Sequence, residues 1–362
     1  MRQLIRSLLL RPVNWIANHL TSDPDKSRVF EALTSLYTHI HDHNGEKGLV
    51  IPFDLSSGKF IVLSDLHKGV KNGADNFMGC EDSYTTALDH YDQQGFHYIC
   101  LGDGEELWGN NIFTVQKKNT ASIEKEKAFI RRNAFTKVFG NHDLLWDQAP
   151  FASALLTNMY GQAVPIYEAL VLTTQANGKK LDIFMTHGHQ GDRQADGNWF
   201  SKFFISVIWG PLEAYLRINP NTPAYDSQLK TLHNSMMYEW SSGQKDLLLI
   251  TGHTHQPVFE SLTLLERLFV QLDQAHEKND AQQAAALQQQ IEDRKWEQPV
   301  VANAYEKIIP SYFNSGCCCF SDGDITGIEI DNGNIRLVRW KSQQRDVLEE
   351  RKLADLLATP LG

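Results

Sequence analysis

The 362-residue chain contains five short polar segments, and each directly follows an apolar run of strand length. They read Ser-Asp-Leu-His at 64–67, Gly-Asp-Gly-Glu-Glu at 102–106, Gly-Asn-His-Asp at 140–143, Thr-His-Gly-His at 186–189 and Gly-His-Thr-His at 252–255. A strand that is buried on both faces reads as a continuous apolar run, which stops where the chain leaves the sheet. Ligand sites form at this edge of an α/β sheet. The pattern therefore predicts one sheet edge rich in Asp, Asn and His.

The rest of the chain alternates between strand-like and helix-like stretches up to about residue 310. Strands are predicted at 60–64, 98–101, 137–139, 181–186 and 247–251, with helices at 82–94 and 123–133. After Pro310 the chain reads as β only, with strands at 311–320, 325–330 and 335–340 and a hairpin turn at 331–333. We predict an α/β sandwich: two mixed β-sheets packed together, helices on both outer faces, and a helical insertion as a cap.

Two stretches, 191–245 and 260–299, interrupt the alternation of strands and helices and divide the chain into parts. The predicted parts are an N-terminal helical segment at 1–47, a core at 48–190, 246–259 and 300–345, an aromatic-rich helical cap at 191–245, a Gln- and Ala-rich helical arm at 260–299, and a C-terminal tail at 346–362. The N-terminal segment is expected to pack on the core as an amphipathic helix, and docking on a membrane surface is the alternative. The arm is expected to be a solvated spacer, and a homo-oligomer interface is the alternative.

Charge and cysteine usage narrow the class of protein. The formal net charge is −10, and the sequence has no basic stripe with interleaved aromatic residues, so a nucleic-acid partner is not expected. The five cysteines match no disulfide framework or zinc motif, which favours a reducing, cytoplasmic compartment. Cys317, Cys318 and Cys319 are expected to be buried in a strand as small apolar groups. The N-terminal stretch reads as neither a signal peptide nor a membrane span.

The polar segments supply oxygen and imidazole groups, which bind the divalent ions that hydrolyse phosphates. Asp65 and His67 are two residues apart, as are His253 and His255, so in extended chain each pair points to one side. Asp103 carries two carboxylate oxygens and can bridge two ions, which together clamp a phosphate.

In the Gly-Asn-His-Asp segment, neighbouring residues are expected to have different roles. Asn141 and His142 would point apart in extended chain, so that Asn141 binds metal while His142 faces the substrate. Asp143 is expected to hold the His142 ring in place. Glu105 adds a carboxylate near the site, which leaves the substrate preference open but not the metal binding.

Together the motifs D-x-H, G-D-x-x-E, G-N-H-D, H-G-H and G-H-T-H resemble those of the calcineurin-like metallophosphoesterase superfamily. The resemblance covers the catalytic core and not the two insertions. It implies one ion bound by Asp65, His67, Asp103 and His255, and a second bound by Asp103, Asn141, His187 and His253. It also implies divalent ions, with manganese expected first and iron or zinc as alternatives. His142 would be the acid near the leaving group.

The implied activity is hydrolysis of small phosphomonoesters or phosphodiesters by a hydroxide that bridges the two ions. His189 would contact substrate or replace His187 as a ligand, and Arg193 and Glu106 are further candidate substrate contacts. The segments 106–108 and 187–192 are also similar to the branch that cleaves UDP-diacylglucosamine at its pyrophosphate, so a lipid-linked nucleotide is the alternative substrate. A scaffold that only binds a partner is a third hypothesis, and the complete ligand set argues against it.

Overall fold

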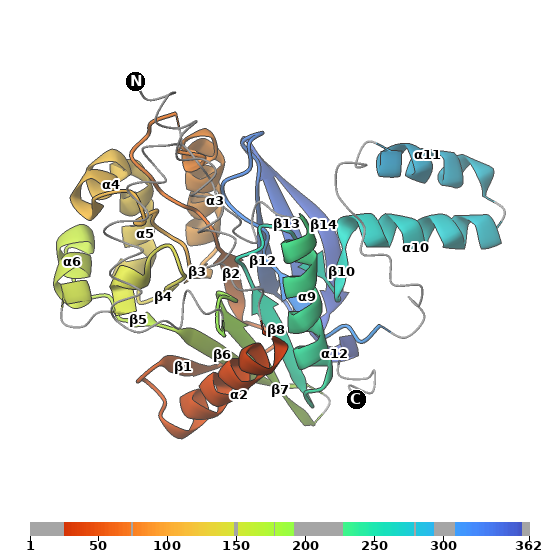
Figure 1. The fold of residues 1–362 in the computed structure, drawn as a ribbon, viewed down its shortest axis with the longest axis horizontal. Coiled ribbons are helices and arrows are strands. Elements are labelled where there is room, and N and C mark those ends of the chain that lie inside the picture. Colours follow the sequence, from red (N-terminus) through yellow and green to blue (C-terminus); the bar gives the residue numbers. More distant parts are fainter. Residues whose placement is uncertain are drawn as a thin grey trace, which may run out of the picture.

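The computed structural model describes residues 25–73, 75–147, 151–176, 178–191, 227–278, 280–292 and 308–356. Within these residues two mixed sheets of seven strands each pack face to face, and helices cover both outer faces (Figure 1). The predicted α/β sandwich is confirmed.

One sheet supplies the first three polar segments. Its strand order is β14 (Gln344–Lys352), β13 (Asn334–Lys341), β12 (Ile325–Asp331), β2 (Lys59–Leu63), β3 (His97–Leu101), β4 (Phe135–Val138) and β5 (Ile166–Tyr167). The strands from β2 to β5 are parallel, so their carboxyl ends lie at the same edge of the sheet.

The other sheet supplies the last two polar segments. Its strand order is β1 (Gly48–Pro52), β6 (Ala169–Ala176), β7 (Lys179–Thr186), β8 (Leu247–Thr251), β11 (Tyr312–Asn314), β9 (Val258–Phe259) and β10 (Leu262–Thr263). β7, β8 and β11 are parallel to one another. The segments that follow β7 and β8 therefore also lie together at one edge of this sheet.

The strand β3 shows why these runs are apolar throughout. Its Ile99 and Leu101 belong to the core between the sheets, whereas Tyr98 and Cys100 pack under the helices on the outer face. Successive side chains of a strand point to opposite faces, so a central strand between two apolar layers needs apolar residues at every position. The sequence pattern therefore identified the central strands correctly.

Helices cover each sheet on its outer face. α3 (Glu81–Gln93), α4 (Ile112–Lys118), α5 (Thr120–Arg131) and α6 (Phe151–Tyr160) cover the β2–β5 side, and α2 (Lys26–Asp42) and α9 (Ser227–Ser242) cover the other sheet. Two short 3₁₀ helices lie at Phe77–Gly79 and Leu144–Asp147. In α2 the residues Val29, Leu33, Leu36 and Ile40 are buried, which is the stripe of an amphipathic helix. α9 falls in the stretch predicted as a cap, but it packs on β8 and β11.

The C-terminal part differs from the prediction at one point. The hairpin turn at 331–333 is confirmed, because Asn332 and Gly333 both have positive φ, at 51° and 74°, between paired β12 and β13. The tail predicted from residue 346 is wrong, since β14 pairs with β13 along this stretch and α12 (Leu353–Leu356) follows it. The charged side chains of β14 suit a sheet edge, where one side of the strand faces water. A stretch this rich in charge reads in the sequence like a solvent-exposed tail.

The Gln- and Ala-rich stretch forms a helical hairpin of α10 (Leu264–Glu277) and α11 (Ala281–Glu292) that extends away from the sheets (Figure 1). Its apolar residues, including Leu268 and Leu287, pack between its own two helices. Residues 1–24 of the predicted N-terminal segment and residues 192–226 of the predicted cap lie outside the described residues. Among the helices of the described ranges, none has the length and apolar character needed to cross a membrane.

Candidate metal centre

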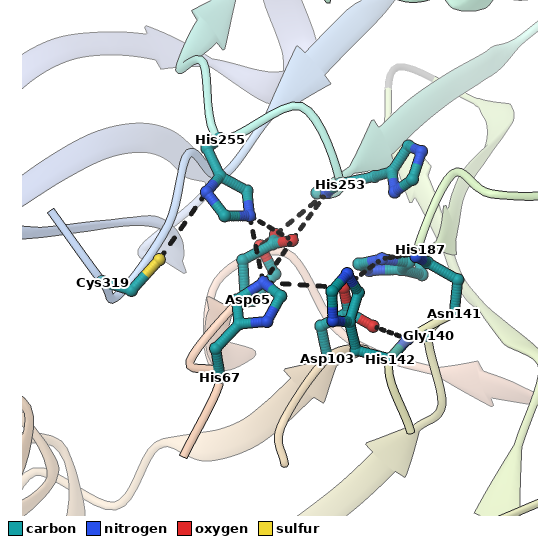
Figure 2. Close-up of polar contacts among 12 residues, drawn as sticks. Asp65, His67, Asp103, Gly140, Asn141, His142, His187, His253, His255 and Cys319 are labelled. Carbon is teal, nitrogen blue, oxygen red and sulfur yellow. Dashed lines mark hydrogen bonds and ion pairs between the residues drawn. The ribbon is translucent and has the colours of Figure 1, made fainter. Parts of the chain in front are cut away.

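The five polar segments meet at one end of the sandwich. Asp65 and His67 follow β2, Asp103 follows β3, and Asn141 and His142 follow β4. From the other sheet, His187 follows β7, and His253 and His255 follow β8. Figure 2 shows these residues, from loops of both sheets, gathered in one region. The sandwich therefore brings together every residue that the sequence predicted as a metal ligand.

The backbone at these residues differs from the extended chain that the sequence analysis assumed. Left-handed φ values between 51° and 69° occur at Asp65, His67, Asp103, His253 and His255. Side chains other than glycine rarely adopt this region, and the strain is retained where the surrounding structure enforces it. Hydrogen bonds from Asp65 N to Gly102 O (3.1 Å) and from His67 N to Asp103 O (2.9 Å) enforce it here. The pairs face one side because of this turn conformation and not because of strand alternation.

Four ligand atoms form a first group. The His255 Nε2 atom lies 3.1 Å from His67 Nε2 and 3.2 Å from Asp65 Oδ1. His67 Nε2 is 3.6 Å from Asp103 Oδ2. Two imidazole nitrogens and two carboxylate oxygens that face one another in this way fit a divalent cation between them.

A second group lies on the other side of Asp103. The His187 Nε2 atom is 3.1 Å from Asn141 Oδ1 and 3.2 Å from Asp103 Oδ2. His253 is 4% exposed, and its Nε2 atom has no hydrogen-bond partner among the described residues. Asp103, His187 and His253 offer ligand atoms that all lie within 4.8 Å of one another. A buried imidazole nitrogen without a partner is costly, so this group too fits a cation.

Asp103 is common to both groups through a single oxygen. Its Oδ1 atom accepts a hydrogen bond from the backbone N–H of His142 at 2.8 Å, which leaves Oδ2 for the two imidazole groups. Burial by itself would raise the pKa of Asp103, but the rings of His187 and His142 hold it well below its usual range. The carboxylate is therefore ionised, as a bridging metal ligand must be.

Two glycines allow the ligand loops to approach one another. A Cβ atom at Gly140 would lie 2.2 Å from Asp103 Oδ1, and one at Gly252 would lie 2.4 Å from Asp65 Oδ2. No side chain fits at either position without displacing a carboxylate. The glycines of G-N-H-D and G-H-T-H are thus explained by space for the neighbouring ligand.

His142 is oriented by a residue other than the predicted one. Its Nδ1 atom lies 2.8 Å from Glu106 Oε2, and the same oxygen is 3.0 Å from Nδ1 of His67. Asp143 instead accepts hydrogen bonds from the backbone N–H groups of Gly140 (2.6 Å) and Gly104 (2.8 Å), and so joins two ligand loops. The predicted contact between Asp143 and the His142 ring is therefore wrong, and Glu106 makes it.

The Glu106 carboxylate also controls the charge of His142. Burial would lower the pKa of His142, but Glu106 and Asp103 raise it to about 9. On its other side, the ring stacks on Trp108 with centroids 4.0 Å apart and planes 10° from parallel. Trp108 Nε1 donates to the backbone oxygen of Asn141 at 2.6 Å. No local sequence pattern predicts this stacking, because it depends on how two loops meet.

Glu105 lies beneath the centre and not in it. Its carboxylate is 3.1 Å from Lys68 Nζ and 2.9 Å from Lys137 Nζ, and Trp146 Nε1 donates to it at 2.8 Å. Glu105 and both lysines are 0% exposed. The expectation that Glu105 adds a carboxylate near the site is therefore corrected, because its partners are all buried protein groups.

The predicted substrate contacts remain predictions. His189 is buried, with its ring centroid 5.4 Å from that of His187, and it lines a cavity of about 660 Å³ together with Phe139 and Trp146. His187 and not His189 faces Asp103 and Asn141. Arg193 lies outside the described residues.

The cysteine run is buried, as predicted, but it is not in a strand. Cys317, Cys318 and Cys319 lie in the loop between β11 and β12. Cys319 Sγ is 3.6 Å from His255 Nδ1, so this loop reaches the metal centre (Figure 2).

The Asp, Asn and His side chains at the strand ends of the two sheets are of the types that bind divalent metal ions in hydrolases. The family model for calcineurin-like phosphoesterases matches residues 58–257, and the chain belongs to this family. The match includes all of the predicted metal ligands. No curated protein matches the chain. The protein is therefore a metal-dependent phosphoesterase that uses divalent metal ions.

Proposed function

We propose that the protein hydrolyses small phosphomonoesters or phosphodiesters at a dinuclear centre. The observation that carries this proposal is the shared Asp103 Oδ2 atom, which faces His67 Nε2 at 3.6 Å and His187 Nε2 at 3.2 Å. The first ion would be held by Asp65, His67, Asp103 and His255, and the second by Asp103, Asn141, His187 and His253. A bridging carboxylate between two imidazole-rich groups is the arrangement that a two-ion phosphoesterase needs.

The ions, when bound, would activate water as the nucleophile and neutralise charge on the phosphoryl oxygens. The chain's own residues prepare the leaving group. The Nδ1–H group of His142 faces Glu106, and the pKa of the ring, raised to about 9, keeps the ring protonated at both nitrogens, so that Nε2–H is the group that would give its proton to the departing oxygen. Trp108 fixes the plane of the His142 ring by stacking, which limits where that proton points.

We propose manganese as the ion in both positions, with iron or zinc as the alternatives. The combined donor set has carboxylate and amide oxygens, which suit manganese, as well as imidazoles, which suit iron and zinc. We also propose that the protein is located in the cytoplasm, a reducing compartment. All five cysteines are free thiols, which supports this location.

The test compares p-nitrophenyl phosphate with bis(p-nitrophenyl) phosphate in the presence of Mn²⁺. Wild-type protein should turn over at least one of them, and the ratio of the two kcat/KM values assigns monoesters or diesters. Asp103→Asn should lower kcat/KM at least about 100-fold, because it weakens the binding of both ions. Even the loss of a residue that only hydrogen-bonds to a metal ligand lowers affinity or activity about 10- to 100-fold. Asp346→Asn, on the edge strand β14, is the matched control and should retain full activity.

Activity of Asp103→Asn within about twofold of wild type would contradict the proposal. The alternative substrate, a lipid-linked nucleotide pyrophosphate, rests on the sequence resemblance of 106–108 and 187–192 alone. Metal-dependent cleavage of such a nucleotide, without turnover of either aryl phosphate, would favour it.

A further inference from the structure

Three of the four candidate ligand histidines, His67, His187 and His255, share one orientation. Each presents Nε2 to the carboxylates of the centre, as the distances to Asp65 and Asp103 show. A ring that binds a cation through Nε2 carries its proton on Nδ1, and that N–H group needs an acceptor.

Two of the three acceptors are of the usual kind. Nδ1 of His187 lies 3.1 Å from the backbone oxygen of Leu101, and Nδ1 of His67 lies 3.0 Å from Glu106 Oε2. A backbone carbonyl and a carboxylate are the groups that normally fix the tautomer of a metal-binding histidine. Among the residues that the structure describes, neither kind of group is a hydrogen-bond partner of Nδ1 in the third ring, His255. The group at this position is the sulfur of Cys319, at 3.6 Å (Figure 2).

The loop that carries Cys319 is attached to the centre through its backbone. The Cys318 N–H group donates to the backbone oxygen of Asp65 at 3.2 Å, and Ser315 Oγ lies 2.7 Å from Ser64 Oγ. Cys319 itself is 7% exposed. The sulfur is therefore held beside the ring by contacts to the same strand end that carries Asp65.

We propose that Cys319 is a positioning residue for the metal ligand His255, whose Nδ1–H group donates to Cys319 Sγ. The contact keeps the proton on Nδ1 and directs Nε2 to the first ion. Sulfur is a weaker hydrogen-bond acceptor than a carboxylate. The expected contribution of Cys319 to metal affinity is therefore at the lower end of the range for residues that hydrogen-bond to a metal ligand. This role accounts for the last residue of the cysteine run, which the proposed function leaves unexplained.

The test measures metal affinity by titrating metal-free protein with Mn²⁺ in a calorimeter. Cys319→Ala should lower the affinity of one of the two ions about 10-fold and leave the other unchanged. Cys319→Ser keeps an acceptor and should recover part of the loss. Cys318→Ala is the matched control, because Cys318 is a buried neighbour whose sulfur faces the Thr326 backbone oxygen at 4.0 Å. It should bind both ions as wild type does.

Two further readouts separate positioning from other roles. The unfolding midpoint of the metal-free protein should be similar in Cys319→Ala and Cys318→Ala, since both remove one buried sulfur. Co²⁺-loaded wild type should show a visible spectrum that changes in Cys319→Ala but has no thiolate-to-cobalt charge-transfer band. Such a band would mean that the sulfur binds the ion directly, and it would overturn the proposal.

Cys317 is the competing acceptor, because its side chain also interacts with His255 and Cys319. Unchanged affinity in Cys319→Ala, with a loss in Cys317→Ala, would overturn the proposal in favour of Cys317. The inference rests on the dinuclear centre of the proposed function. Wild-type protein that binds no ions would overturn both, whereas equal affinity in wild type and Cys319→Ala would overturn the inference alone.

Discussion

The ligand loops and the α10–α11 hairpin are stabilised in different ways. The loops hold Asp65, Asp103 and His253 at left-handed φ values, each of which costs about 1–3 kcal/mol where the residue is not glycine. Contacts between segments far apart in sequence, such as the hydrogen bond of His253 N to Asp65 Oδ2 at 2.9 Å, retain this geometry. The hairpin has regular helices, an N-terminal capping box of Thr263 and Glu266, and an apolar cluster of its own.

The difference shows where this fold concentrates its tertiary constraints. Strain, buried charge and close packing occur together at the ligand loops, because metal binding needs fixed side-chain positions. The described residues of the hairpin have no left-handed φ value. Apart from the ion pairs of Arg267 with Glu260 and Glu349, the hairpin depends on local helix signals and on its own apolar cluster. Substitutions should therefore have large effects at or beneath the loops and small effects in the hairpin.

The largest effect is expected on stability, from Lys137→Met beneath the loops. Lys137 is 0% exposed and pairs with Glu105 at 2.9 Å, so its loss leaves a buried carboxylate with one cation fewer. The free energy of unfolding should fall by about 3–5 kcal/mol, as measured by urea denaturation. Lys180→Met removes an exposed lysine that is 2.9 Å from Asp182, and it should cost less than about 1 kcal/mol. Equal losses in the two variants would contradict the role of the buried cluster.

The next effect is expected on activity, from Gly140→Ala. The new Cβ would lie 2.2 Å from Asp103 Oδ1 and should displace the carboxylate shared by both groups of ligands. We expect kcat/KM to fall at least about 100-fold, the upper end of the loss seen for partners of metal ligands. Gly243→Ala is the control, since its nearest neighbour is 3.6 Å away. A Gly140→Ala enzyme with wild-type kcat/KM would show that the close approach is not needed.

A smaller loss of activity is expected from Glu106→Gln. The amide keeps the shape but removes the charge that faces both His67 and His142, so kcat should fall about 10- to 100-fold. The unfolding midpoint should stay within the error of the measurement. Glu124→Gln, at an exposed pair on α5, controls for the loss of one negative charge. If kcat stays within twofold of wild type, Glu106 does not orient these rings.

The smallest effect is expected from removing the hairpin. Replacing residues 264–292 by a short Gly-Ser linker should leave kcat/KM within about twofold, because the apolar side chains of the hairpin pack on one another. Light scattering on the same protein tests the homo-oligomer alternative. A smaller number of subunits than in the full chain would assign the hairpin to a subunit interface, and a large fall in kcat/KM would contradict its independence from the centre.

How far the sequence predicts the fold depends on whether the signal is local. The central strands were predictable because burial on both faces makes them apolar at every position, as in β3. β14 was missed because its charges, such as Glu349 and Glu350, are compatible with an edge strand and with a tail alike. The turn at Asn332 and Gly333 was predictable because few residue pairs adopt its backbone angles.

The sequence by itself placed Asp, Asn and His at the ends of apolar strands, and the resemblance of its motifs to the calcineurin-like family implied which of them are ligands. Only the tertiary structure decided how they work together. In the structure Glu106, and not Asp143, orients the His142 ring. Glu105 lies in a buried ion-pair cluster and not in the site, and Cys319 lies beside His255. These contacts join loops of different strands, and the positions of loops depend on how two sheets pack, which no local pattern encodes.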